Sequence, residues 1–290
     1  MKWALLAFGP IGVGAGRVLC GAAVLWLMWL LRRKSRWPLV WVDLPALALL
    51  IAIAFCIPFC VQPYVLGLVE ATAGHGSAFV GLVIVFVPLF TVIVSIPLLR
   101  VYPTKLQLVG IIGGLLFIAL LFADEVLHNV PLRYLLLGLV PPFCYSLGNT
   151  YIKRRFQHVP PMVLALAALS ATGLVLTPLS AAVETVTVDA RFWQAAAALA
   201  VLGVVCTGLA THWFYTLIQR RGPLYAGMVT YIVPCLAIFI AWLDAERITG
   251  GQIVAILGVL AMVALVQYRP PAARTAPVEP EPLERGSTEV

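Results

Sequence analysis

The sequence predicts an all-α polytopic membrane protein that is built from two inverted-topology helical repeats. Three observations support this prediction. First, 62% of the 290 residues are hydrophobic, only 11% are charged, and the mean hydropathy is +1.02, whereas a soluble domain has about 45–50% apolar and about 25% charged residues. Second, the apolar residues form runs of the roughly 20 residues that a helix needs to cross a bilayer. Third, the second half of the chain repeats patterns of the first half in the same order.

The composition also excludes several classes of protein. Such an apolar excess cannot be hidden in one core of a chain of this length, which excludes a soluble enzyme, a nucleic-acid-binding domain and a disordered chain. The uninterrupted apolar runs exclude a β-barrel, because its strands alternate in polarity. The net charge of +7 does not indicate nucleic acid, because the basic residues lie in short clusters between apolar runs, where they orient membrane helices.

Nine segments are predicted to span the membrane. The loops that connect them are short, so no soluble domain is expected between them. In chain order the predicted spans are Pro10–Leu31, Leu44–Leu68, Gly76–Leu98, Leu106–Phe122, Leu132–Ile152, Pro161–Val183, Trp193–Ile218, Leu224–Leu243 and Gly250–Gln267.

The charges of the loops predict the orientation of the spans. Loops after the odd-numbered spans carry eleven basic residues, and loops after the even-numbered spans carry three basic residues together with most of the acidic ones. Because short cytoplasmic loops are enriched in Lys and Arg, the first span is predicted to begin outside and the C-terminus to be cytoplasmic. The eleven basic residues are Arg32, Arg33, Lys34, Arg36, Arg100, Lys105, Lys153, Arg154, Arg155, Arg220 and Arg221.

The two ends of the chain differ from the spans. Residues 1–9 do not form a cleavable signal peptide, because Pro10 and Arg17 follow and no small-residue cleavage site ends a clean apolar region. Residues 269–290 contain five prolines, four glutamates and almost no large apolar side chains. We therefore expect a disordered cytoplasmic tail.

The six cysteines all fall within apolar runs. Cys56 and Cys60 share a helix face at spacing i, i+4, which would suit a metal pair, but no histidine or carboxylate lies nearby on that helix. We therefore interpret the cysteines as small buried apolar residues. The sequence predicts no metal, no disulfide framework and no cofactor.

The chain contains an internal repeat. Span one matches span six, and spans two to four match spans seven to nine, whereas span five has no counterpart in the first half. The sequence ahead of Gly9 is too short to cross a bilayer, so a complete repeat would hold five spans and the first copy lacks its first one. Either the true start lies upstream or the protein works with nine spans. The paired positions are Pro88 with Pro234, Thr104 with Thr249, Gln107 with Gln252, and Gly113 with Gly258.

An odd number of spans per repeat has a geometric consequence. The second copy of a five-span repeat enters the membrane from the opposite side, which is the inverted-topology arrangement of many secondary transporters.

A family resemblance becomes visible at these residues. The second copy resembles the EamA-type repeat of the drug/metabolite transporter superfamily, and Pro88 through Gly113 is similar to the same repeat. The resemblance covers roughly residues 8–268, with a first repeat in residues 1–126, a second in 127–268 and the tail in 269–290. The matching residues of the second copy are Pro234, Glu246, Arg247, Thr249, Gln252, Ala255 and Gly258.

The resemblance implies an inner-membrane carrier with ten spans in two inverted halves of five. Members of this family move small metabolites such as amino acids, often outward. The chain departs from the pattern in its first half, where the first span is missing and Val101 occupies the Glu position beside Arg100.

Two ionisable side chains lie inside predicted spans. Arg17 lies seven residues into span one, roughly 10 Å from its outer end; it either binds an anionic group of a substrate or has a structural role, reaching outward or pairing with a carbonyl or Glu70. His212 lies near the cytoplasmic end of span seven and either relays a proton, because histidine titrates near neutral pH, or packs with its hydrogen bonds satisfied.

The other polar residues of the spans suggest a cavity. No carboxylate lies in the middle of a predicted span, which argues against carboxylate-based proton coupling and against a pocket for cations. Polar groups within lipid turn inward or bond to other helices. Prolines that interrupt spans have two possible meanings: they mark the binding sites and hinges of a carrier, or they only kink a helix. The candidate cavity residues are Arg17, Gln62, Tyr64, Tyr145, Asn149, Thr207, His212 and Tyr231, and the candidate hinges are Pro58, Pro88 and Pro234.

The predicted function is secondary transport, with export as the expected direction, of a small metabolite such as an amino acid or an amphipathic compound. The alternative is a membrane scaffold or a truncated, inactive carrier. A membrane-embedded enzyme is disfavoured, because the chain has no paired aspartates, no His-Glu-x-x-His and no Gly-x-Ser-Gly. The expected partners are a small-molecule substrate and the lipid bilayer, without nucleic acid, and a homodimer is compatible with the sequence.

Overall fold

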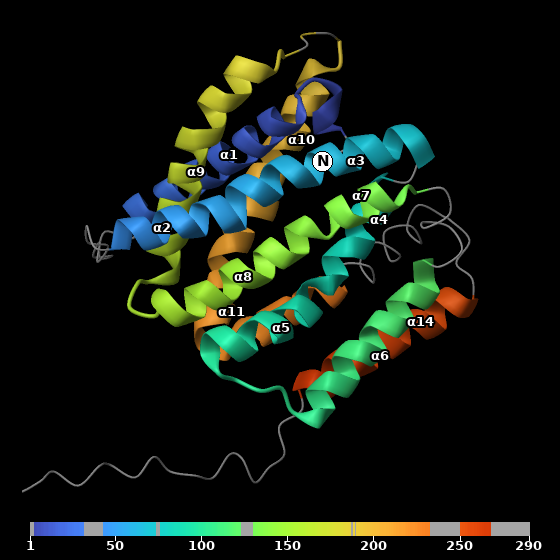
Figure 1. The fold of residues 1–290 in the computed structure, drawn as a ribbon. Helices are drawn as coiled ribbons and strands as arrows, with labels where there is room; N and C mark the ends of the chain where they lie inside the picture. The colour runs from blue at the N-terminus through green and yellow to red at the C-terminus, as the bar shows by residue number, and fades with distance from the viewer. Residues whose placement is uncertain are drawn as a thin grey trace, which may run out of the picture.

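The computed structural model describes residues 3–31, 43–73, 76–122, 130–186, 188, 190–232 and 250–267. Within these ranges the chain is helical and contains no β-strand. Most of the predicted eighth span, including Pro234, lies outside the described residues, as do the loop 32–42 and the tail 269–290 (Figure 1).

Most predicted spans are divided into several helical segments. In chain order the segments are η1 (Ala4–Leu6), α1 (Pro10–Leu31), α2 (Leu44–Ile51), η3 (Ala52–Cys56), α3 (Ile57–Ala73), α4 (Gly76–Val83), η4 (Ile84–Phe86), α5 (Val87–Leu99), α6 (Lys105–Phe122), α7 (Leu132–Gly138), α8 (Val140–Arg155), α9 (Pro161–Val183), α10 (Phe192–Gly203), η5 (Val204–Leu209), α11 (Ala210–Arg221), α12 (Pro223–Gly227), η6 (Met228–Tyr231) and α14 (Gly250–Gln267).

Five helical stretches are long and apolar enough to cross a membrane. They correspond to the predicted spans one, two, three, six and seven, and two of them, α1 and α9, have the predicted bounds. In the fourth and ninth predicted spans, the apolar stretches Lys105–Phe117 and Leu257–Val266 are shorter. The five are Pro10–Leu31, Leu44–Thr72, Phe79–Leu99, Pro161–Val183 and Phe192–Arg221.

The fifth predicted span is interrupted. Helix α7 ends at Gly138 and α8 begins at Val140, with Leu139 between them. Pro141 and Pro142 follow directly, and a proline cannot donate the backbone hydrogen bond that would continue the preceding turn. The expectation that prolines interrupt some of the predicted spans is therefore met within Leu132–Ile152.

Two spans contain a π-helical turn. In η3 the turn closes when Ile57 donates its N–H to the carbonyl of Ala52, five residues back, and in η5 Ala210 donates to Val205. A π turn places one extra residue in the helix and is frequent at functional sites. These two turns lie in spans two and seven, which are partners in the internal repeat.

Spans three and eight, which are also partners in the predicted repeat, contain 3₁₀ turns. Segment η4 lies in span three and ends two residues before Pro88, while η6 follows α12 within the predicted span eight. Pro58 likewise follows a π turn, η3, by two residues. A proline leaves a carbonyl of the preceding turn without its usual donor, which favours irregular geometry at these positions.

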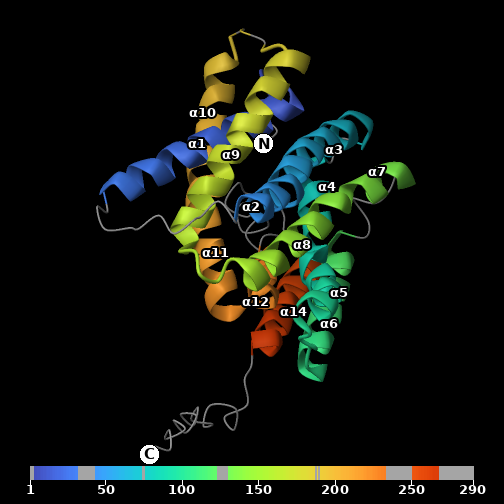
Figure 2. The same cartoon turned by 60° about the vertical axis from the view of Figure 1, so that its left-hand side comes forward.

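Two pairs of helices pack along one another. Helix α1 packs on α9, and α6 packs on α14; Figures 1 and 2 show the first pair at one end of the bundle and the second pair at the other. In the second pair Gly110 lies against Val266, while Phe117 lies against Gly258. The ascending numbers of one helix therefore meet the descending numbers of the other, so α6 and α14 are antiparallel.

The pair of α1 and α9 is also antiparallel. The carboxylate of Glu184, directly after α9, accepts hydrogen bonds from the backbone N–H groups of Ile11 (2.9 Å) and Gly12 (2.7 Å) in the first turn of α1. The first turn of a helix has free N–H groups and a partial positive charge, so a carboxylate there is stabilising. The end of α9 is thereby fixed to the beginning of α1.

Candidate functional site

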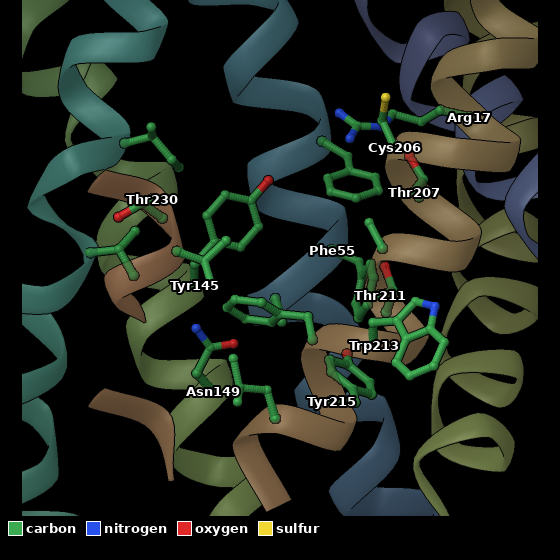
Figure 3. A pocket seen from close by; sticks show the side chains of 18 residues that line it. Arg17, Phe55, Tyr145, Asn149, Cys206, Thr207, Thr211, Trp213, Tyr215 and Thr230 are labelled. Carbon is green, nitrogen blue, oxygen red and sulfur yellow. Dashed lines mark hydrogen bonds between the residues drawn. The ribbon is translucent and has the colours of Figure 1, made fainter. Parts of the chain in front are cut away.

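A cavity of about 480 Å³ lies in the middle of the bundle (Figure 3). Its wall includes residues of four irregular turns, namely Phe55 of η3, Ile84 of η4, Thr207 of η5 and Thr230 of η6. Helices α1, α3, α5, α8 and α11 complete the wall. The irregular segments that are partners in the repeat therefore meet around one space.

Aromatic side chains make up much of the wall. Phe55, Phe59, Trp213 and Phe214 line it, with small residues such as Ala54 between them. The volume falls in the range of about 300–1,000 Å³ that is usual for small-molecule sites. An apolar wall with a few polar groups suits a small amphipathic ligand.

Arg17 is the charged residue of the cavity wall within the described part of the chain. Its Nε donates a hydrogen bond to Oγ1 of Thr207 at 3.0 Å, and its guanidinium carbon lies 4.2 Å from the centre of the Phe59 ring, as in a cation–π contact. The side chain is only 8% exposed, so it extends into the bundle instead of reaching outward to water. Nη1 is buried and has no hydrogen-bond partner among the described residues.

The close approach of α1 to η5 positions Arg17. A Cβ atom on Gly208 would lie 2.7 Å from the backbone oxygen of Gly21, and one on Gly203 would lie 2.9 Å from that of Arg17. Small residues at such crossings allow helix backbones to touch in a membrane. Thr207, next to Gly208, therefore reaches Arg17, while its hydroxyl also donates to the carbonyl of Leu202, five residues back in the π turn.

Two further buried polar groups lack a partner within the described structure. They are Nδ2 of Asn149 on α8 and the hydroxyl of Tyr215 on α11, whose side chains are 6% and 3% exposed. Both line the cavity, and Figure 3 shows Asn149 at the end of the cavity away from Arg17. Buried polar atoms are normally hydrogen-bonded, so these two need a partner from inside the cavity.

Four of the eight candidate residues from the sequence lie on the cavity wall: Arg17, Tyr145, Asn149 and Thr207. Gln62 lies behind the wall, where its side-chain oxygen accepts a hydrogen bond from the Tyr145 hydroxyl at 3.3 Å. The sequence did not distinguish wall residues from those behind them, because both kinds are polar and within a span.

The other three candidates lie elsewhere. Tyr64 is 51% exposed on the outside of α3. His212 is buried beside Trp213, with ring centroids 5.5 Å apart. Tyr231 is buried between helices and donates its hydroxyl to the carbonyl of Ile111 at 3.0 Å.

The wall also contains polar residues that were not predicted from the sequence to line a cavity, including Thr211 and Thr230. Cys206 is another: it is exposed and lines the cavity, so the prediction that it is buried is wrong. Cys56 and Cys60 are half-buried, and Cys144 is buried as predicted. Turn η5 places Cys206 at the cavity, and the apolar sequence around this residue did not indicate that position.

Fold and cavity together define a polytopic helical membrane protein with an internal binding space. Comparison with known families then identifies it more closely: residues 132–268 match the EamA-like transporter family. The second half of the chain is thus similar to an EamA-like repeat, as the resemblance predicted for this half.

The fold itself has a close match among solved structures. One chain, titled only "Crystal structure of protein", superposes with a TM-score of 0.71 over 91% of this chain and 93% of its own length, at 20% sequence identity. At that identity the likeness concerns the fold alone. No curated protein sequence matches this chain.

Proposed function

We propose that this protein is a secondary transporter that moves a small amphipathic metabolite across the inner membrane by alternating access. The observation that carries the proposal is the composition of the cavity wall, where η3 and η4 of the first half face η5 and η6 of the second. A cavity between two related halves can open to either side when one half rocks against the other.

The packing of repeat partners supports an inverted arrangement of the halves. Spans one and six, α1 and α9, lie together and are antiparallel, and so are spans four and nine, α6 and α14. Matching helices that run in opposite directions are what a two-fold axis in the membrane plane produces. The nine-span inverted topology is therefore part of the proposal.

The positions of the loops support the predicted orientation. Val101 and Pro103 after the third predicted span line one pocket together with Lys153 and Arg221 from the basic ends of α8 and α11. We assign this face to the cytoplasm by its positive charge, and we place the C-terminus there. A reporter fused after Val290 that fluoresces only in the cytoplasm tests this orientation.

The irregular turns are suited to act as hinges. A π or 3₁₀ turn interrupts the regular hydrogen-bond ladder, so a small change in backbone angles there tilts one part of a span against the other. Pro58 and Pro88 lie next to such turns on the first half. Rocking about these points would widen the cavity at one end and close it at the other.

Flux into liposomes tests the proposal. Purified protein should accumulate at least one compound from a panel of radiolabelled metabolites, with saturable kinetics. Ala210→Trp, which fills part of the cavity, should abolish that flux, because Ala210 lines the wall. Ala200→Trp, on an exposed position of α10, is the matched control and should retain it.

The alternative of a non-transporting scaffold or inactive carrier gives a different result. It predicts no saturable flux of any compound, and equal behaviour of the Ala210→Trp and Ala200→Trp variants. Export is tested by comparing liposomes loaded with substrate inside against those with substrate outside. A proton relay through His212 is tested under an imposed pH gradient, where His212→Ala should uncouple flux from the gradient.

A further inference from the structure

We propose that the ligand of the central cavity is an organic carboxylate with an apolar body and without an amino group. Arg17 would bind the carboxylate at one end of the cavity, and Asn149 and Tyr215 would bind a hydrogen-bond acceptor at the other end. This inference names the substrate class and rests on the proposed transport function.

Arg17 carries a positive charge in the buried wall of the cavity. A cation buried within a membrane is costly unless an anion accompanies it. Among the described residues that line the cavity there is no Asp or Glu, and Arg17 is held by a hydroxyl and an aromatic face. The counter-charge is therefore expected from the ligand.

The contacts of Arg17 set the direction in which its guanidinium can donate further hydrogen bonds. Thr207 accepts from Nε, and Phe59 covers a face of the guanidinium. These contacts hold the plane of the group in place and leave Nη1 to donate. A carboxylate suits a guanidinium, because its two oxygens accept strong, charge-assisted hydrogen bonds in that plane.

The other end of the cavity carries two further hydrogen-bond donors. Nδ2 of Asn149 and the hydroxyl of Tyr215 are buried donors without a partner in the described structure, and both face the same space (Figure 3). Donors at both ends of the cavity require acceptors at both ends of the ligand. A phenol, a carbonyl or a second carboxylate would meet this need.

The lining of the cavity disfavours ligands that carry a positive charge. An ammonium group of a zwitterion or a cation is bound most strongly beside a carboxylate, and the side-chain oxygens of the described lining residues are all neutral. The same ammonium would be repelled by Arg17. The aromatic side chains Phe55, Phe59 and Phe214 between the two ends favour an apolar, preferably aromatic body.

Four compounds of nearly equal size test the charge preference. They are 3-(4-hydroxyphenyl)propanoate (an anion), its neutral amide, tyramine (a cation) and tyrosine (a zwitterion). We expect flux, and quenching of protein fluorescence, with the anion at concentrations about 10–100-fold lower than with the amide. Tyramine and tyrosine should be bound still more weakly than the amide.

Two variants assign the preference to the two ends of the cavity. Arg17→Gln should bring the ratio of the affinity for the anion to the affinity for the amide close to one. Because both affinities are measured on the same variant, this ratio does not depend on the fraction of the protein that is folded. Tyr215→Phe should leave that ratio high but remove the advantage, about 3–10-fold, of 3-(4-hydroxyphenyl)propanoate over 3-phenylpropanoate.

The outcomes separate this inference from the proposed function. Saturable flux of tyrosine or tyramine that equals or exceeds flux of the anion would overturn the carboxylate inference and leave transport intact. An anion preference that persists in Arg17→Gln would overturn the role of Arg17. Absence of binding and flux for every compound of both panels would overturn the inference and the proposed function together.

Discussion

Arg17 and Thr207 are 190 residues apart in the sequence, yet Nε of the first donates to Oγ1 of the second at 3.0 Å. Arg17 belongs to α1 of the first half, and Thr207 belongs to the π turn η5 of the second. This one hydrogen bond joins the two halves at the wall of the cavity. It also orients the charged group on which the proposed ligand chemistry depends.

The Thr207 hydroxyl should be important for stability as well as for binding. Thr207→Val keeps the shape of the side chain but leaves the buried Arg17 Nε without its acceptor, and we expect a loss of about 1–3 kcal/mol in unfolding free energy. The measurement is unfolding in detergent micelles followed by circular dichroism. Thr177→Val, on an exposed position of α9, is the control; equal stability of the two variants would contradict the prediction.

The contact of Gly21 with Gly208 should tolerate no added methyl group. Gly208→Ala places its Cβ against the backbone oxygen of Gly21, so α1 and η5 must separate, at an expected cost of about 1–3 kcal/mol. Gly67→Ala is the matched control, because nothing lies within 4 Å of the added atom. That control should be neutral or stabilising by about 0.5–1 kcal/mol. Thermal unfolding of the Gly208→Ala and Gly67→Ala variants measures the two changes in stability, and equal stability of the two variants would contradict the prediction.

Glu184 should stabilise the beginning of α1. Glu184→Ala removes the acceptor of Ile11 and Gly12, and we expect a cost of about 0.5–2 kcal/mol, as for the loss of a helix cap. Glu184→Gln retains one acceptor oxygen without the charge and should lie between alanine and the natural residue. Faster hydrogen exchange at Ile11 and Gly12 in the alanine variant would report the same loss locally. Unchanged exchange at both amides would show that the carboxylate does not hold the helix.

Asp43 should couple weakly to Arg155. Its carboxylate is buried and lies 3.7 Å from Nη2 of Arg155 and 3.3 Å from Nε2 of His158, but Arg155 is 44% exposed. A double-mutant cycle of Asp43→Ala with Arg155→Ala should therefore give about 0.2–1 kcal/mol, and less at high salt. The same cycle with the neighbouring Arg154 is the control and should give a value near zero. Coupling that is unaffected by salt would argue against a screened ion pair.

The sequence was a good guide to features that depend on one segment at a time. Helices α1 and α9 begin and end where predicted, because a span is recognised by its length and apolarity alone. The match of residues 132–268 to the EamA-like family agrees with the spacing from Pro234 to Gly258. The break at Leu139 lies two residues before Pro141, and Pro141 and Pro142 are visible in the sequence as residues that interrupt a span.

The candidate site was only partly predictable, because a polar residue within a span has several ways to be satisfied. Tyr145 faces the cavity, Tyr231 bonds to a carbonyl of α6, and Tyr64 lies on the outside. All three are tyrosines within predicted spans, so the sequence alone does not distinguish their positions. Which face each presents depends on the crossing of neighbouring helices and on the extra residue that a π turn inserts.

The sequence by itself determined the class of the protein, the position of most apolar helices and the presence of a repeat, since these follow from composition and local spacing. Tertiary structure decided which groups share the cavity: the contact of Gly21 with Gly208 brings Thr207 to Arg17, and four irregular turns meet around one space. The physical reason is that apolarity specifies that a helix is in the membrane, whereas only packing against other helices specifies which of its sides faces the ligand.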